Sequence, residues 1–429
     1  MSQNINFILK EVLNKINPKK DEIKKIDFLL RSFISKIKDN IRKNGIYADV
    51  FVGGSWAKRT IIKKDRYDID IFIRFNKDYK SQYISTLTEK ILSGIGMNKQ
   101  KIHGSRDYFI VKVSKEVFFE IIPVKKISNP KEAENITDLS YLHVKYINKK
   151  IKSERMRNDI RLIKAFCFAN NCYGAESYIS GFSGYGLELL VYYYGSFLKL
   201  IKEIAKVSNN KKLIIDIEKH YKNKERILLD INSAKLQSPI ILIDPTYKQR
   251  NVLAALSNET FKKFQNAIKR FLKNHSVKAF EQKEIDVKKI ENIAKSKNYE
   301  FLLIKALTDR QEGDVAASKL LKFYKYILND IEKFFEVNNK GFKYQKGKSA
   351  LFFFVTSGPK EILIKGPLLN QREHVNRFKQ KYRKLFIKND RIYAKYKTSS
   401  SLHQFIKRWK QKYKKQIKDM SIKKLDIIK

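Results

Sequence analysis

The spacing of hydrophobic and polar positions changes several times along the chain, and each change predicts a different kind of element. Apolar residues recur at helical spacing over residues 5–44, where Pro18 divides them into two expected helices. Residues 46–124 instead carry short strand-like runs around a helical segment at 83–94, a pattern typical of a mixed α/β domain. The expected strands are residues 48–52, 69–75, 108–113 and 117–124.

A polar stretch centred on Pro130 then leads into helical patterns over residues 138–207, so a domain boundary is expected near residue 137. Another helix is expected at 252–272, after the irregular segment DPTYKQRN. From residue 301 the pattern alternates again and predicts a second α/β unit. Its expected strands are 301–306, a strand around 342, 351–356 and 391–396, and its expected helices are 316–335 and 372–385. The expected domains are residues 1–137, 138–275 and 276–429.

The segment 401–417 predicts an amphipathic, basic helix. Phe405, Trp409, Tyr413 and Ile417 are spaced four residues apart and form an apolar stripe. The basic positions are candidates for RNA contact, and the stripe is equally compatible with a helix that docks on the protein and leaves its lysines in water. The candidate RNA-binding residues here are Lys407, Arg408, Lys410 and Lys414.

Composition adds an electrostatic constraint. With 91 Lys and Arg against 44 Asp and Glu in 429 residues, the formal charge is +47, which favours a polyanionic partner. The excess of Lys, Ile and Asn is also what AT-rich coding DNA produces. Only two cysteines, Cys167 and Cys172, are present, so a disulfide scaffold is excluded and a reducing, cytoplasmic setting is expected. No apolar run reaches the length of about 20 residues that crosses a bilayer.

The most informative motif is GGSWAKRT, residues 53–60, directly after the predicted strand YADVFV. A strand that enters a Gly-Gly turn and then a helix leaves backbone N–H groups free to bind phosphate oxygens. Gly54, the Ser55 hydroxyl and the Lys58 ammonium are therefore candidate phosphate-binding groups.

Three acidic residues follow this motif. Asp68 and Asp70 alternate within an apolar strand and project from the same face, and Glu120 interrupts the apolar run VFFEIIPV. Carboxylates placed this way repel one another unless a cation lies between them, so they are candidate metal ligands and catalytic residues. Such a triad can hold two Mg²⁺ ions about 4 Å apart for nucleotidyl transfer. The alternative for the acids alone is a solvent-facing strand edge.

In these motifs the sequence resembles the nucleotidyltransferase superfamily of DNA polymerase β and, more closely, the archaeal class I CCA-adding enzymes. The resemblance covers nearly the whole chain. It implies an α/β multi-domain protein with a polymerase β-like nucleotidyltransferase head, a helical neck, an α/β body and a basic helical tail. The further motifs that carry it are TDLSYLH, DIRLIKAFCFANNCYGAE, GFSGYGLELLVYYYGSF, IDPTYKQRNVLAALS and IKGPLLNQREHVNRF.

The resemblance also implies roles for individual residues. Ser55 and Lys58 would contact the triphosphate, and the acids Asp68, Asp70 and Glu120 would bind the metals. Arg250 would face the base and the RNA end. The nucleotide, its sugar and its phosphates would also be held by Ser140, His143, Lys164 and Tyr173.

Two positions depart from the family pattern. Arg59 stands where Gly or Asn is usual, and Glu120 stands where Asp is more common. The first departure is expected to alter the turn or make the site more basic. The second moves the third carboxylate outward by one methylene group.

The implied reaction is template-independent addition of CCA to tRNA from CTP and ATP, with release of pyrophosphate and recognition of the RNA by its shape. Two alternatives stay open. One is another RNA 3′-terminal nucleotidyltransferase of the superfamily, either a poly(A)-type enzyme or an oligonucleotide synthase. The other is a tRNA-binding protein without catalysis. No membrane partner is expected, and a homodimer stays open.

Overall fold

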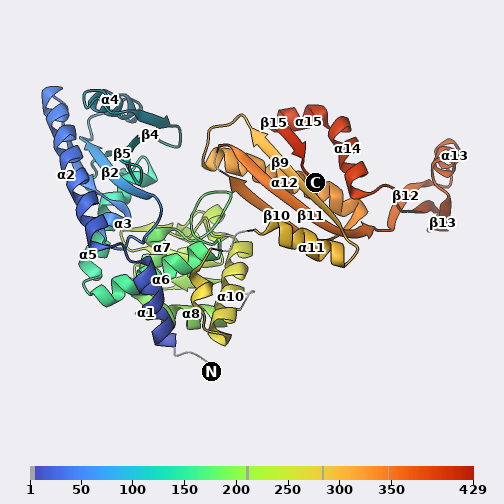
Figure 1. Cartoon of the computed structure of the whole chain (residues 1–429), viewed down its shortest axis with the longest axis horizontal. Coiled ribbons are helices and arrows are strands. Elements are labelled where there is room, and N and C mark those ends of the chain that lie inside the picture. Colours follow the sequence, from blue (N-terminus) through green and yellow to red (C-terminus); the bar gives the residue numbers. More distant parts are fainter. Residues whose placement is uncertain (1–4, 209–211, 283–284, 346) are drawn as a thin grey trace. The chain divides into compact units, whose positions relative to one another are not determined.

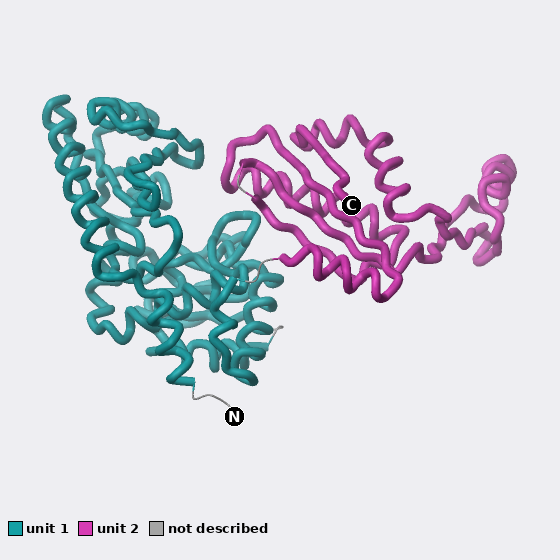
Figure 2. Tube along the Cα trace, in the orientation of Figure 1, with its two compact units in different colours: residues 1–283 teal, residues 284–429 magenta. Residues whose placement is uncertain are grey.

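The computed structural model describes residues 5–208, 212–282, 285–345 and 347–429 (Figure 1). The chain forms two compact units, Met1–Lys283 and Glu284–Lys429 (Figure 2). Each unit has its own sheets and its own buried cores. Among the described residues, no helix combines the length and apolar character needed to span a membrane.

The first unit contains a five-stranded sheet with the order β1-β2-β5-β4-β3. Its two long central strands, β2 and β5, are parallel, and the other pairs are antiparallel. The four strands expected from the sequence are all present, and β3 is an additional one. Their bounds are β1 Ala48–Val52, β2 Tyr67–Phe75, β3 Lys99–Ile102, β4 Tyr108–Lys112 and β5 Val117–Lys125.

One face of this sheet is covered by α2 (Lys20–Lys43) and α4 (Ser81–Ser93). Ile69, Ile71 and Ile73 of β2 join this core, which also contains apolar residues of both helices. Because side chains alternate along a strand, the residues between these isoleucines project from the opposite face. That opposite face carries Asp68 and Asp70.

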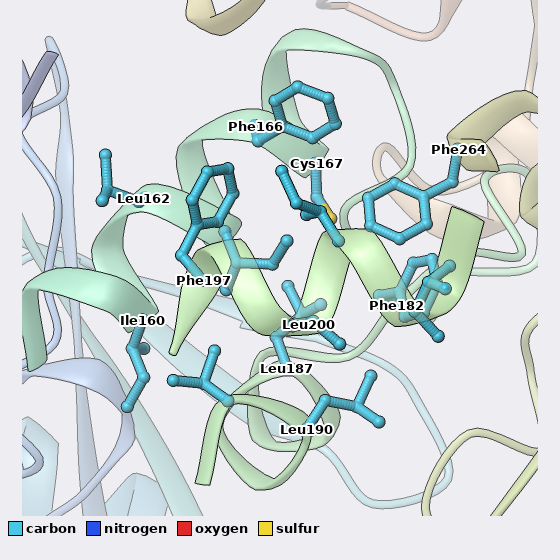
Figure 3. Packing of buried hydrophobic residues seen from close by; sticks show 14 of the residues in the cluster. Ile160, Leu162, Phe166, Cys167, Phe182, Leu187, Leu190, Phe197, Leu200 and Phe264 are labelled. Carbon is cyan, nitrogen blue, oxygen red and sulfur yellow. The ribbon is translucent and has the colours of Figure 1, made fainter. Parts of the chain in front are cut away.

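The rest of the first unit is mainly helical, and aliphatic side chains and phenylalanine rings pack together in its core (Figure 3). Phe166 lies at the centre of this core, with ring centroids 6.0 Å from Phe264 and 6.1 Å from Phe197. The helices are α1 Ile5–Ile16, α5 Ser140–Lys150, α6 Glu154–Ala169, α7 Gly184–Tyr194, α8 Phe197–Lys206, α9 Lys224–Asp230 and α10 Asn258–Lys273.

Two expectations for this region were wrong in detail. The helix expected at 252–272 begins only at Asn258, because the Ser257 side chain accepts a hydrogen bond from the Thr260 N–H and caps it there. The segment expected to be irregular contains a strand, β8. It belongs to a small sheet of β6 Leu213–Ile215, β7 Ile240–Asp244 and β8 Tyr247–Asn251.

The second unit is built on a four-stranded sheet with the order β10-β11-β9-β15. The helix α12 (Asp314–Phe334) packs against it through a core of aliphatic and aromatic residues, and α11 (Val287–Ser296) contributes Ala294 to a smaller separate cluster. The strands are β9 Glu300–Thr308, β10 Phe335–Gln345, β11 Ser349–Pro359 and β15 Ile422–Ile427.

A second, three-stranded sheet follows, with the order β12-β14-β13 and the helix α13 (Arg372–Lys381). The helix expected at 372–385 was too long, because the chain leaves it at Lys381 and enters β13. The strands are β12 Ile362–Leu368, β13 Lys384–Lys388 and β14 Arg391–Tyr396.

The predicted basic helix is present but broken at Tyr413 into α14 (Leu402–Lys412) and α15 (Lys414–Asp419). Its aromatic stripe docks on the second unit. Trp409 is 4% exposed, and its indole Nε1–H donates to Asp330 Oδ2 over 2.7 Å. Lys407, Arg408, Lys410 and Lys414 are exposed.

Candidate active site

A glycine turn after β1 lies directly against β2. The Gly53 N–H donates to the Asp70 carbonyl oxygen over 2.9 Å. Gly54 has a φ of +58°, and a Cβ at this position would lie 1.7 Å from Asp70 Oδ2. Glycine is therefore required here twice, once for the left-handed backbone and once for the close approach. The turn leads into the short helix α3 (Gly54–Ala57).

The turn ends at Arg59, which has a left-handed φ of +55°. Gly and Asn adopt this conformation with the least strain, which gives a physical reason for their use at this place in the family pattern. Here a residue of the helix α6 stabilises the strained segment: Arg161 Nη2 donates a hydrogen bond to the Arg59 carbonyl oxygen over 2.7 Å.

The three predicted carboxylates lie on one face of two neighbouring strands. Asp70 of β2 pairs in register with Glu120 of β5, so their side chains stand side by side, and Asp68 is two residues away. Burial, followed by the charges of Asp70 and Asp68, raises the pKa of Glu120 to about 7. Burial also raises the pKa of Asp70, and the charge of Asp68 adds to that rise. These carboxylates therefore repel one another.

The donor chemistry of this face suits a hard divalent cation, because carboxylate oxygens are the ligands that Mg²⁺ prefers and a cation relieves their repulsion. Among the described residues, no three Asp, Glu, His or Cys side chains are gathered closely enough to form a metal cluster as they stand. Asp68 is instead paired with Arg66, whose Nε donates to Asp68 Oδ1 over 2.7 Å. This ion pair uses Oδ1 of Asp68, and Oδ2 is the oxygen not engaged by it.

Next to this face, two lysines converge on a buried glutamate, and we call Lys58, Thr60, Lys164 and Glu188 the ammonium cluster. Lys58 Nζ lies 2.6 Å from Glu188 Oε2, and Lys164 Nζ lies 2.7 Å from Glu188 Oε1. The Thr60 hydroxyl donates to Glu188 Oε1 and accepts from Lys164 Nζ. Burial lowers the pKa of Lys164 to about 8, although the charge of Glu188 opposes the shift.

A cavity connects the glycine turn at Ser55, the acid Asp68, and Thr60 and Lys164 of the ammonium cluster. Lys164 and Asp68 both line it, so an anion there would meet an ammonium group, and a cation bound at Asp68 would lie beside that anion. Gly184 lies close to this wall, since a Cβ there would be 2.9 Å from the Tyr173 hydroxyl. The lining residues are Ser55, Thr60, Ile61, Ile62, Lys64, Arg66, Tyr67, Asp68, Lys164, Phe168 and Tyr173.

A second polar group, which we call the aspartate cluster, comprises His143, Tyr185, Asp244 and Arg250. Asp244 Oδ2 lies 3.0 Å from His143 Nε2 and 2.6 Å from Arg250 Nη1, and Asp244 Oδ1 accepts from the Tyr185 hydroxyl over 3.2 Å. Burial would raise the pKa of Asp244, but His143 and Arg250 hold it well below its usual range. The buried carboxylate therefore stays ionised and orients Arg250.

The two clusters meet at Tyr185. Its ring is stacked on His143 with centroids 4.1 Å apart, and Lys58 Nζ lies 5.8 Å from the same ring. Ser140, at the first position of α5, is three residues before His143. The structure thus brings the predicted residues of the first unit into one connected region, whereas Lys407, Arg408, Lys410 and Lys414 belong to the second unit.

Four residues of the two clusters were not predicted as site residues: Thr60, Tyr185, Glu188 and Asp244. Glu188 carried a usable signal, because it interrupts the apolar run GLELLVYYY as Glu120 interrupts VFFEIIPV. An acidic residue within a buried segment needs positive partners. Asp244 ends the apolar run IILID in the same way.

The sheet, the glycine turn and the paired acids define a nucleotidyltransferase of the polymerase β-like fold. The fold also occurs in a solved structure. The chain matches the RNA terminal uridylyl transferase Cid1 with a TM-score of 0.50 and 14% sequence identity, over 66% of this chain and 98% of that one.

Within that class, sequence relatives identify the family. The chain is 35% identical to the CCA-adding enzyme of Nanoarchaeum equitans over 88% of this chain and 90% of the relative. It is 33% identical to the CCA-adding enzyme of Methanocaldococcus jannaschii, over 91% and 87%. The family model "tRNA nucleotidyltransferase, second domain" matches residues 158–281, and "Second Messenger Oligonucleotide or Dinucleotide Synthetase domain" matches residues 1–141. The chain belongs to the CCA-adding enzyme family, and the predicted tRNA nucleotidyltransferase function is confirmed.

Proposed function

We propose that this chain adds the terminal CCA to tRNA at the face formed by Asp68, Asp70 and Glu120, with CTP and then ATP as donors. The observation that carries this site assignment is the register of β2 and β5, which sets Asp70 beside Glu120 while the glycine turn lies against Asp70. Transfer of a nucleotidyl group from a triphosphate to an RNA hydroxyl requires a phosphate-binding turn beside carboxylates that repel one another until a cation binds.

The roles follow from position. Gly54 and Ser55 hold phosphate oxygens at the turn, and Lys58 and Lys164 supply positive charge to the triphosphate. Enzymes of this class generally use divalent metal ions, and we assign two Mg²⁺ ions to Asp68, Asp70 and Glu120. When bound, they would activate the RNA 3′-hydroxyl and stabilise the charge on the leaving pyrophosphate. Tyr173, on the cavity wall, offers a ring or a phenol to the nucleotide.

The aspartate cluster is our candidate for recognition of the base and the RNA end. Asp244 fixes Arg250 by a short ion pair, so the guanidinium presents its remaining N–H donors in a defined direction. His143 is held on the same carboxylate, and burial lowers its pKa, which keeps the ring neutral at physiological pH. Ser140 is assigned to the nucleotide on position alone.

We assign tRNA binding to the second unit, where the exposed basic residues of α14 and α15 would contact the phosphate backbone of the RNA. In this assignment residues 1–137 are the catalytic head, 138–275 the helical neck, and 276–429 the body and tail. Lysines spread over a surface bind phosphates without reading sequence, so the RNA is recognised by its shape.

A substitution series tests the site. Asp70→Asn and Glu120→Gln should each lower CCA addition by at least about 100-fold, while tRNA affinity changes less than about twofold, because both keep the size of the side chain and remove a metal ligand. Glu116→Gln is the matched control: Glu116 is an exposed acid next to the same strand, in an ion pair with Lys25 at 3.6 Å. Parental turnover in Asp70→Asn would contradict the assignment.

The match of residues 1–141 to an oligonucleotide synthetase domain supports one alternative, a synthase of short oligonucleotides. The assay separates the two functions by product. With labelled CTP and ATP, our proposal expects label only on tRNA that lacks its CCA end, and soluble oligonucleotides formed without tRNA would favour the alternative.

A further inference from the structure

We infer that Glu188 is a positioning residue for nucleotidyl transfer: it holds Lys58 and Lys164 side by side, ready for the triphosphate. This inference rests on the proposed triphosphate role of the two lysines. It adds a residue that does not itself contact the substrate but determines where two substrate-binding groups stand.

The geometry of Glu188 is that of a clamp. Its side chain is fully buried on α7, and each carboxylate oxygen accepts a hydrogen bond from a different lysine. The distances are 2.6 Å from Oε2 to Lys58 Nζ and 2.7 Å from Oε1 to Lys164 Nζ. The two lysines come from elements far apart in sequence, the end of the glycine turn and α6. The single carboxylate therefore joins the turn of the catalytic sheet to the helical part of the unit.

Charge explains why a clamp is needed. Lys58 and Lys164 are 8% and 3% exposed, and two buried ammonium groups so close repel each other strongly without a shared anion. One carboxylate leaves the pair with a net charge of about +1. The cluster is therefore stable before substrate arrives, yet it still attracts a polyphosphate.

The hydrogen bonds leave donors for a ligand. An ammonium group has three N–H donors, and Lys164 uses two of them in hydrogen bonds, one to Glu188 and one to Thr60. Lys164 also lines the cavity next to Ser55. A phosphate oxygen in that cavity can accept a hydrogen bond from the third N–H of Lys164 while the bonds to Glu188 and Thr60 remain.

The other groups that face the cluster set its polarity. Lys64 adds positive charge near Lys164, the Asp70 carboxylate interacts electrostatically with both lysines, and Tyr173 lines the cavity. Glu188 is thus the anion that touches both ammonium groups directly. Replacing its charge should displace the lysines instead of merely loosening the helix.

The test compares Glu188→Gln, Glu188→Asp and Lys164→Met in the full chain, with tRNA lacking its CCA end. We expect Glu188→Gln to raise KM for CTP and ATP by at least about tenfold while KM for tRNA changes less than about twofold. Glu188→Asp keeps the charge at shorter reach and should give an intermediate KM. Inhibition by inorganic tripolyphosphate should weaken in parallel, since it reports the triphosphate site alone.

A double-mutant cycle then separates positioning from folding. If Glu188 acts through Lys164, Glu188→Gln should add less than about threefold to KM in the Lys164→Met background. A folded Glu188→Gln enzyme with parental KM for nucleotides overturns the inference. If that variant does not fold at the assay temperature, Glu188→Asp decides, and a parental KM there has the same meaning.

The Lys164→Met variant distinguishes a failure of the positioning role of Glu188 from a failure of the triphosphate role of the lysines. A raised nucleotide KM in Lys164→Met together with a parental KM in the Glu188 variants refutes only the clamp. A parental nucleotide KM in Lys164→Met refutes the triphosphate role on which the clamp rests.

Discussion

A substitution of Gly54 introduces two effects, a steric clash with Asp70 and strain from the left-handed backbone, and a suitable control can distinguish them. Gly54→Ala places a Cβ 1.7 Å from Asp70 Oδ2 and keeps a φ of +58°, so we expect CCA addition to fall by at least about 100-fold. The control is Gly45→Ala, because Gly45 has a φ of +60° and would have nothing within 4 Å of its Cβ. Steady-state assays of both should show the loss only at Gly54, and equal losses would mean that strain alone is responsible.

The pKa of Glu120 predicts how the metal-free enzyme responds to pH. Because the folded-state pKa is raised from 4.5 to about 7, the folded state binds the proton more tightly than the unfolded state. The associated stability is present below pH about 4.5 and is lost as the pH rises through about 7, an effect on the order of 3 kcal/mol. Urea unfolding in chelator should show this loss.

Glu120→Gln is the matched variant for that measurement, since it cannot ionise. Its free energy of unfolding should depend less on pH between about 5 and 8 than that of the parent. Added Mg²⁺ should recover the parent's stability at pH 8 and have less effect on the variant. The same pH slope in both proteins would show that Glu120 is not the group responsible.

At the scale of single residues, the sequence predicted the acids and the glycine turn because each breaks a local pattern that physical chemistry explains. It did not predict the clusters. Glu188 lies in an apolar run of the helix α7, and Asp244 ends an apolar run of the strand β7. Only the tertiary fold brings their partners to them. His143, for example, is 101 positions from Asp244 in the sequence. Pairing of that kind has no local periodicity.

At the scale of elements, strands with clear alternation or apolar runs were predicted well, and β1 and β14 match the expected bounds. The strand β8, with the sequence YKQRN, was missed because it is polar and lacks a strand-like pattern of its own. It is a strand because it pairs with β7. The helix expected at 372–385 ran past its end because the short segment YRKL, residues 382–385, does not by itself distinguish the end of a helix from the start of a strand.

The elements α14 and α15 carry the prediction for RNA binding. Removing three exposed charges with Lys407→Gln, Arg408→Gln and Lys414→Gln should weaken tRNA binding and reduce the slope of log affinity against log salt by about 2 to 3. Lys410 is left in place because its Nζ donates to the Leu425 carbonyl and contributes to the fold.

The matched control removes the same charge from another helix. Lys36→Gln, Lys38→Gln and Lys43→Gln on α2 alter exposed residues of the first unit. Titrations of labelled tRNA at several salt concentrations should show the parental slope for this control. If both triple variants lose the same slope, general charge and not the helices α14 and α15 accounts for binding.

At the scale of the whole molecule, each of the two compact units contains its own hydrophobic core. We therefore expect calorimetry of the full chain to show two unfolding transitions. Added CTP with Mg²⁺ should raise only the transition of Met1–Lys283, because the residues assigned to the nucleotide and the metals all belong to that unit. A single transition that shifts as a whole would show that the units unfold cooperatively.

The net charge of +47 also acts on the whole molecule. Such a charge accelerates association with any polyanion and makes affinity depend on salt, but it does not select a particular RNA. We therefore assign selection of the RNA to its shape and to the proposed contacts at its end.

The hydrogen bond from Gly53 to Asp70 and the missing side chain of Gly54 have one more consequence. The backbone that we assign to the nucleotide and the carboxylate that we assign to the ion are joined directly, by this hydrogen bond and by the close approach of Gly54 to Asp70, so we expect binding at one to affect the other. Nucleotide and metal affinities are then linked, and thermodynamic reciprocity requires each to strengthen the other by the same factor.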